Sequence, residues 1–312
     1  MKPFAFIFPG QGSQSVGMLD GWGDHAAVRA TLDEASQALG ADVARLIHEG
    51  PKEQLDLTTN TQPVMLTAGV ACYRAWLAET HAAPCVVAGH SLGEYTALVA
   101  AGAMSLADAL PLVRFRAQAM QEAVPVGAGA MAAILGLDAE AVQRGCAAAQ
   151  AATGEVVQAA NFNDPKQTVI AGTKAGVDKA CELLKAAGAK RTLPLAVSAP
   201  FHSSLMKPAA ERLRRRLATT PIDAPFIPVI DNIDAKSETE PAAIRDALFR
   251  QAYGAVRWSE TIQAIRARGL IHIFECGPGR ILAGMVKRID ADAVSAAVYD
   301  PASLGDARAL LT

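Results

Sequence analysis

Ser91 lies between two glycines, in the run Gly89-His90-Ser91-Leu92-Gly93. The apolar segment 85–88 precedes this run and predicts a strand that turns sharply into a helix at the serine. Such a G-x-S-x-G turn exposes the hydroxyl at the positive end of the helix, and glycine tolerates the close backbone approach that the turn requires. Ser91 is therefore the first candidate nucleophile. An N-cap serine after a buried strand has the same local pattern, so the motif alone leaves both interpretations open.

A nucleophilic serine needs a base, and the chain has six histidines. His90 adjoins Ser91, but consecutive side chains at a sharp turn point in different directions, which disfavours a hydrogen bond between them. His202 lies in the segment 197–204, which follows a predicted strand and contains Pro200. Loops at strand ends often carry catalytic groups, so His202 is the candidate base. Solvated or packing roles suit the remaining histidines: His25, His48, His81 and His272.

Arg116 is the candidate anion-binding residue. On the helix predicted after Ser105 it shares an apolar face with Leu112 and Met120, whereas Arg114 lies on a more polar face. An arginine on an apolar face needs a buried anionic partner, and its planar guanidinium suits a carboxylate. That carboxylate belongs either to a substrate or to an aspartate or glutamate of the chain, and the sequence does not decide between them.

A glycine-rich loop occupies residues 10–17. A dinucleotide-binding fingerprint would need glycine where the chain has Ser15, and a phosphate-binding loop would need lysine where it has Met18. The spacing therefore argues against a nucleotide site. The loop nevertheless places backbone N–H groups just past a predicted parallel strand, at the edge where α/β folds bind ligands. If it lies beside Ser91, it can donate to an oxyanion.

Strands alternate with helices in the first third of the chain. Strands are predicted over residues 4–8 and 85–88, and helices over 26–39 and 62–77. A helix from Ser91 to about Ala101 is followed by a second one capped by Ser105, and Pro111 is expected to kink this second helix or shift its start. This order predicts an α/β fold with a parallel sheet that is covered on both faces.

The pattern changes after residues 125–129. Strands are predicted over 130–135, 155–161, 167–171 and 190–197, and helices over 139–152 and 175–187. The order βαββαβ is typical of a ferredoxin-like unit. After Ser198 the pattern returns to helices that alternate with apolar strands over 226–230 and 271–275. We therefore predict a discontinuous core, residues 1–126 and 198–312, with a small domain inserted at 127–197.

The composition is that of a globular protein. With 312 residues, of which 51% are hydrophobic, the chain is long enough for a large buried core, and its net charge of −2 gives no support for nucleic-acid binding. No apolar run approaches about 18 residues, and the apolar N-terminal stretch is too short for a signal peptide, so we expect no membrane span and a cytoplasmic location. The five cysteines lack C-x-x-C spacing and are expected to be reduced.

Six motifs between residue 4 and about residue 290 resemble those of the malonyl-CoA:acyl carrier protein transacylase family of bacterial fatty-acid synthesis. In chain order they are Phe8–Gln14, Gly89–Tyr95, Arg116 with Met120–Pro125, Asn161–Asn163, Pro200–His202 and Glu275–Gly279. The resemblance implies an α/β-hydrolase-like core with an inserted ferredoxin-like domain. It also implies transfer of a malonyl group from malonyl-CoA to the phosphopantetheine thiol of acyl carrier protein, through a malonyl-serine intermediate.

The resemblance assigns a role to each catalytic residue. Ser91 would be the nucleophile and His202 the base, with the histidine oriented by the backbone carbonyl of Gln251 instead of a carboxylate. The backbone N–H groups of Gln11 and Leu92 would form the oxyanion hole. The chain departs from the family pattern at positions 254–255, where Gly-Ala replaces a common Asn-Pro pair.

Substrate-binding residues follow from the same resemblance. Arg116 would bind the free carboxylate of the malonyl group, and the ring of Phe201 would leave no room for a substituted acyl group. Further substrate contacts are implied at Met120, Asn161 and His90. No cofactor and no metal are expected, because the CoA thioester is itself a substrate.

Acyl carrier protein would be a transient, acidic partner of an enzyme that we expect to be monomeric. Basic residues that suit such a partner are Lys190, Arg191, Lys287, Arg288 and the run Arg214–Arg216. Three other classes stay open at this stage. A serine hydrolase would release free malonate, an acyltransferase with another acyl preference would not pair its substrate with Arg116, and a binding protein would use neither Ser91 nor His202 chemically.

Overall fold

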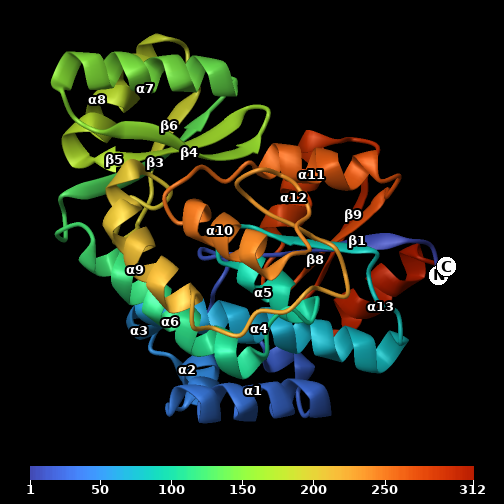
Figure 1. Ribbon diagram of the computed structural model, residues 1–312. Helices are drawn as coiled ribbons and strands as arrows, with labels where there is room; N and C mark the ends of the chain where they lie inside the picture. Colours follow the sequence, from blue (N-terminus) through green and yellow to red (C-terminus); the bar gives the residue numbers. More distant parts are fainter.

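A five-stranded parallel sheet forms the centre of the molecule. The computed structural model describes all 312 residues, and Figure 1 shows its two sheets with their helices. The strand order is β7-β2-β1-β8-β9, and every neighbouring pair is parallel. The strands are β7 (Val229–Ile230), β2 (Val86–Gly89), β1 (Phe4–Phe8), β8 (His272–Cys276) and β9 (Val294–Val298). Because β1 and β2 are adjacent and parallel, the loops that follow them emerge side by side.

Both faces of this sheet are buried, which explains the uninterrupted apolar sequence of β1. Phe4, Phe6 and Phe8 belong to the larger hydrophobic cluster, whereas Ala5 and Ile7 belong to a second cluster on the opposite face. The larger cluster includes residues of α1 (Ala26–Leu39), α4 (Thr58–Thr80), α6 (Leu106–Glu122) and α13 (Pro301–Leu310), and the second includes residues of α11 (Trp258–Ala267) and α12 (Ile281–Ile289).

The remaining helices of the core are short. They are α2 (Val43–Glu49), α3 (Lys52–Leu55), α5 (Gly93–Ala100), α9 (Lys207–Leu217) and α10 (Pro241–Gln251), with 3-10 turns at Asp20–Trp22 and Ser204–Met206. None of the helices combines the length and the apolar character needed to cross a bilayer.

A smaller antiparallel sheet is formed by the middle of the chain. Its strands are β4 (Val157–Asp164), β5 (Gln167–Thr173), β3 (Gly129–Leu135) and β6 (Arg191–Pro194), in that spatial order. The helices α7 (Ala139–Thr153) and α8 (Lys174–Ala186) cover the face that points away from the large sheet (Figure 1). Residues of the opposite face, among them Met131, Ala133 and Val169, pack together with Phe201 of the core.

The two sheets are joined through β4. The backbone of Val256, in the loop before α11, donates to Ala160 at 2.9 Å and accepts from Phe162 at 2.9 Å. An ion pair of 2.7 Å links Asp164 at the end of β4 to Arg288 on α12. These contacts fix the small sheet over the carboxyl edge of the large one.

Most predicted elements are confirmed, including the βαββαβ order, but three expectations were wrong or incomplete. The strand predicted over 226–230 is reduced to its last two residues, because the backbone N–H of Phe226 bonds to Ala101 of the α5–α6 connection and its ring is 90% exposed. The prediction omitted β9 and α13. Of the two effects expected of Pro111, a shift of the start of α6 does not occur, since Ser105 caps that helix by accepting the Asp108 N–H.

Candidate active site

The turn between β2 and α5 holds Ser91 in a left-handed conformation with φ of 52°. A Cβ on Gly89 would lie 1.9 Å from the backbone of Gly93, and one on Gly93 would lie 2.1 Å from the carbonyl oxygen of Phe8. No other residue type fits these two positions. The predicted strand-to-helix turn is therefore present, and its glycines are required by backbone packing.

His202 is hydrogen-bonded to this serine. The distance from Ser91 Oγ to His202 Nε2 is 2.7 Å, and His202 Nδ1 lies 2.9 Å from the carbonyl oxygen of Gln251 and 3.2 Å from that of Gly254. Because carbonyl oxygens only accept, Nδ1 carries the proton and Nε2 is free to accept the serine proton. The expected Gln251 carbonyl is thus in place, and Gly254, where the chain departs from the family pattern, supplies a second acceptor.

Burial determines the charge of this histidine. The ring is 4% exposed, and burial together with the nearby guanidinium of Arg116 lowers the pKa of His202 to about 3. The imidazole is therefore neutral near pH 7, which is the state a general base requires. The other histidine beside the serine, His90, bonds to Asn163 Oδ1 at 2.8 Å and makes no hydrogen bond with Ser91.

Arg116 is 2% exposed and lies next to the serine. Its Nη1 donates to Gln62 Oε1 at 2.8 Å, and its Nη2 donates to Gln251 Oε1 at 2.9 Å and to Ser91 Oγ at 3.3 Å. The guanidinium also lies over the ring of Tyr95. These partners are all neutral, Nε has none, and no carboxylate lies within ion-pairing distance. The structural salt bridge left open by the sequence is therefore not formed, and the cation remains available to an anionic group.

Two backbone donors face the same region. A Cβ on Gly10 would lie 2.5 Å from the carbonyl oxygen of His90, so the glycine-rich loop packs directly against the serine turn. Gln11 and Leu92 both line the cavity that contains Ser91, and neither backbone N–H donates to another group of the protein. Two free donors beside a nucleophile can stabilise negative charge on a carbonyl oxygen under attack.

These groups open into a cavity of about 640 Å³ between the two sheets. The predicted site residues in its lining are Gln11, His90, Ser91, Leu92, Arg116, Asn161, Phe201 and His202. Met120 does not line it, because its side chain is buried in the hydrophobic core. Its predicted contact with substrate finds no support in this arrangement.

The predicted docking residues lie outside the cavity. Lys190, Arg191 and Lys287 are exposed and form no ion pair, whereas Arg288 pairs with the buried carboxylate of Asp164. Of the run 214–216, Arg214 pairs with Glu211 on the same helix. The structure contains no group of three or more histidine, cysteine, aspartate or glutamate side chains arranged to hold a metal ion.

Several polar residues of the site were not predicted. Gln62 and the side chain of Gln251 bind Arg116, Asn163 binds His90, and Asn232 and Glu94 lie behind the serine turn. A polar residue on an otherwise buried helix, such as Gln62 on α4, and an amide just after a strand, such as Asn232 after β7, were the available signals. Burial raises the pKa of Glu94 to about 8, with the Asp231 carboxylate as a second cause.

Comparisons with known proteins agree with this geometry. The chain matches the acyl transferase domain family over residues 5–296. It is 50% identical over 308 residues to the malonyl CoA-acyl carrier protein transacylase of Escherichia coli K12, covering 98% of this chain and 99% of that protein. The crystal structure of an acyl-carrier-protein S-malonyltransferase from Burkholderia pseudomallei is 64% identical, with a TM-score of 0.96 and coverage of 98% and 99%. A malonyl-transacylase solved in complex with a type II PKS acyl-carrier protein is 48% identical, with a TM-score of 0.96 and the same coverage.

Proposed function

This chain belongs to the acyl transferase family, among the malonyl-CoA:acyl carrier protein transacylases, and we propose that Ser91 carries the malonyl group between its two thiol substrates. The enzyme transfers malonyl groups from malonyl-CoA to acyl carrier protein and so supplies fatty-acid synthesis. The observation that carries the residue assignment is the convergence of Ser91, neutral His202 and a cation without a counter-anion, Arg116, in one cavity.

In the first half-reaction, Ser91 Oγ attacks the thioester carbon of malonyl-CoA while His202 Nε2 takes the serine proton. The carbonyl oxygen becomes an oxyanion that accepts from the N–H groups of Gln11 and Leu92, and one such donor is worth about 3 kcal/mol in the transition state. The C–S bond then breaks, His202 returns the proton to the leaving thiolate, and CoA departs as the free thiol.

The second half-reaction reverses these steps with a different thiol. His202 removes the proton of the phosphopantetheine thiol, the sulfur attacks the malonyl ester of Ser91, and the proton passes to the departing Oγ. Two backbone carbonyls hold the imidazole in the correct tautomer during both steps. Carbonyl groups stabilise an imidazolium less than a carboxylate would, so they assist His202 by orienting its ring more than by neutralising its positive charge.

Arg116 is assigned to the free carboxylate of the malonyl group. The Arg116 guanidinium already lies 3.3 Å from Ser91 Oγ, so a carboxylate that one methylene group separates from the reacting carbonyl lies within its reach. An acetyl group would leave this buried cation without its anion. Phe201, a core residue that packs against the small sheet, is assigned to excluding substituted acyl groups, and Asn161 and His90 to contacts with the rest of the substrate.

We also propose a division of the chain into two domains. We describe the parallel sheet and its helices, residues 1–126 and 198–312, as an α/β-hydrolase-like core. Residues 127–197, with strand order β4-β5-β3-β6, are described as a ferredoxin-like small domain.

Acyl carrier protein is the second partner of this family, and a relative has been solved with such a protein bound. We assign docking to the exposed cations Lys190 and Arg191, with Lys287 as a second patch, because an acidic carrier would be attracted to them. Arg288 is a weaker candidate, since Asp164 already neutralises it. The steps above use only groups of this chain and its two substrates. The monomeric state and the cytoplasmic location stay predictions.

Mass spectrometry of the intact protein after addition of malonyl-CoA tests the proposal. We expect one malonyl adduct on Ser91, discharged by holo acyl carrier protein much faster than by water. An adduct that water discharges at the same rate would indicate a hydrolase. An adduct that persists unchanged in Ser91→Ala would place the nucleophile elsewhere.

A further inference from the structure

The conformation of Ser91 is one that a residue with a Cβ rarely adopts. Its φ of 52° lies in the left-handed region, where surrounding contacts must hold the backbone. The two flanking glycines leave room for the turn, but they do not hold it. Hydrogen bonds to the peptide groups of residues 89–91 must therefore determine where the serine hydroxyl points.

Asn232 supplies two of these hydrogen bonds. Its Oδ1 accepts from the backbone N–H of Ser91 at 2.6 Å, and its Nδ2 donates to the carbonyl oxygen of Gly89 at 2.7 Å. One side-chain amide thus spans both ends of the turn, in the way that a neighbouring strand would bind it. The residue is completely buried and lies 141 positions away in the chain from Ser91.

A second amide binds the other side of the serine. Gln251 Nε2 donates to the carbonyl oxygen of Ser91 at 2.8 Å and lies 3.1 Å from Glu94 Oε2. The same Glu94 oxygen accepts from the backbone N–H of Asn232 at 2.9 Å. The N–H and the carbonyl of Ser91 are therefore each bound by a buried side-chain amide, and Glu94 binds both of these residues, Asn232 through its backbone N–H and Gln251 through its side chain.

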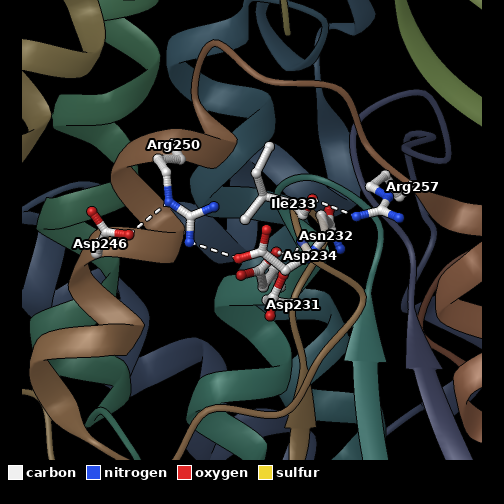
Figure 2. Close-up of polar contacts among 8 residues, drawn as sticks. Asp231, Asn232, Ile233, Asp234, Asp246, Arg250 and Arg257 are labelled. Carbon is white, nitrogen blue, oxygen red and sulfur yellow. Dashed lines mark hydrogen bonds and ion pairs between the residues drawn. The ribbon is translucent and has the colours of Figure 1, made fainter.

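The loop that carries Asn232 is itself held in place (Figure 2). Asp231 Oδ1 accepts from the backbone N–H of Asp234, and the Asp234 carboxylate pairs with Arg250 at 2.7 Å. On the other side, the backbone N–H of Arg257 donates to the carbonyl oxygen of Asn232 at 2.9 Å. These contacts fix the loop independently of the Asn232 side chain, which leaves that side chain free to serve the turn.

We propose that Asn232 is a positioning residue of the transfer reaction, which holds the backbone of Ser91 so that its hydroxyl stays aligned with His202 and with the acyl carbon. This inference rests on the proposed role of Ser91 as nucleophile. Because Asn232 occupies the N–H of Ser91, that N–H does not take part in the oxyanion hole, which leaves this task to Gln11 and Leu92.

The test is single-turnover malonylation of Ser91, followed by mass spectrometry over a range of malonyl-CoA concentrations. In Asn232→Ala we expect the maximal acylation rate to fall about 10²-fold, as misplacement of a reacting atom by about 1 Å does. The half-saturating malonyl-CoA concentration should change less than about threefold, since Arg116 and the cavity wall are untouched. Lys236→Ala, in the same loop, is the matched control, because the exposed Lys236 side chain forms no hydrogen bond or ion pair, and it should retain the rate within about threefold.

A second variant keeps the test independent of any folding defect. Asn232→Asp preserves the shape of the side chain, and its protonated form can still accept from Ser91 and donate to Gly89, whereas its ionised form cannot donate. Its acylation rate relative to wild type should therefore rise as the pH is lowered. A wild-type rate in Asn232→Ala, equal losses in Asn232→Ala and Lys236→Ala, or a pH-independent ratio for Asn232→Asp would each overturn the inference while leaving the proposed function intact. If wild type forms no adduct on Ser91, the proposed function fails, and the inference fails with it.

Discussion

The two walls of the cavity differ in the kind of residue they contribute. The large-sheet wall carries Ser91, His202, Arg116 and Gln11, and its buried groups are linked to one another by hydrogen bonds. The small-sheet wall contributes apolar side chains such as Met131 together with two asparagines. The exposed cations Lys190 and Arg191 lie just before and at the first residue of its edge strand, β6.

This difference suggests that the large-sheet wall carries out the reaction, whereas the small-sheet wall guides the substrates to it. The carboxyl ends of parallel strands, backed by helices on both faces, hold reacting groups rigidly. The small sheet lies over these reacting groups and forms the opposite wall, which the phosphopantetheine arm of CoA or of a carrier protein must pass. We therefore expect changes in the large-sheet wall to alter the rate of bond formation, and changes in the small-sheet wall to alter binding.

The largest effect is expected for His202→Ala. Without a base to take the serine proton, malonylation of Ser91 should slow about 10⁴-fold, as measured by single-turnover mass spectrometry. The matched control is His90→Ala, which removes another ring from the cavity but no hydrogen bond to Ser91. Losses of the same size in the two variants would contradict the assignment of His202 as the base.

Arg116→Ala should have the next largest effect, and it should be selective. A buried ion pair that loses one partner typically costs about 3 to 5 kcal/mol, so malonyl transfer should fall about 10²- to 10⁴-fold more than acetyl transfer. The ratio of kcat/KM for malonyl-CoA and acetyl-CoA measures this selectivity. Arg114→Ala, on the same helix but bonded to the carbonyl of Leu39, should leave the ratio unchanged. Equal losses for both substrates in Arg116→Ala would contradict a role in specificity.

The sequence was sufficient to predict these reacting residues because local rules govern them. The glycine spacing around Ser91 reflects backbone contacts that only glycine permits, and the apolar face around Arg116 predicted its burial. The partners that hold these residues come from distant segments. Gln62 and Gln251 reach Arg116 from 54 and 135 positions away, and no local pattern encodes such contacts.

The same distinction explains the errors in the fold. β1 was predicted at its observed bounds because a strand buried on both faces is continuously apolar. β9 lies at the edge of the sheet and is only partly buried over most of its length, so its sequence Val-Ser-Ala-Ala-Val gives a weaker signal. The apolar residues around Phe226 gave a false signal for a strand, because the backbone of Phe226 bonds to the α5–α6 connection and its ring lies in solvent.

The raised pKa of Glu94, which lies behind the large-sheet wall, can be tested by measuring the free energy of unfolding of Glu94→Gln. The raised pKa of about 8 means that the folded protein keeps a proton which the unfolded chain releases above its ordinary pKa of 4.5. The contribution of Glu94 to stability is therefore complete below pH 4.5 and is lost as the pH rises toward 8, by about 1.4 kcal/mol per unit. Glutamine cannot titrate, so the stability of Glu94→Gln relative to wild type should increase between pH 5 and 7.5 in urea unfolding. A constant difference would contradict the raised pKa.

Glu122 provides a control of opposite sign. The Arg212 guanidinium lowers the pKa of this exposed carboxylate, so its contribution to stability is present above the ordinary pKa and is lost as the pH falls. The stability of Glu122→Gln relative to wild type should therefore not increase between pH 5 and 7.5.

On the small-sheet side, Lys190→Glu combined with Arg191→Glu should raise the KM for acyl carrier protein about tenfold, because two attractive charges become repulsive. Both side chains are exposed and form no ion pair, so the fold should be unaffected. The rate of malonylation by malonyl-CoA should stay within about twofold of wild type. If the carrier-protein KM does not change, docking would have to be assigned to another patch, and Lys287→Glu would test the alternative.

The smallest effect is expected for wild type itself as the pH is lowered from 7 to 5. For an ordinary histidine with a pKa of 6.5, the neutral fraction would fall about 25-fold between pH 7 and pH 5, whereas burial and Arg116 lower the pKa of His202 to about 3. The single-turnover malonylation rate should therefore fall less than about twofold. The contribution of His202 to stability does decrease over this range, because below pH 6.5 the unfolded chain binds a proton that folded His202 does not take up until about pH 3. Circular dichroism must accordingly show that the protein is folded at each pH. A loss of rate with an apparent pKa near 6.5 in folded protein would mean that the imidazole on the large-sheet wall is not held neutral by its surroundings.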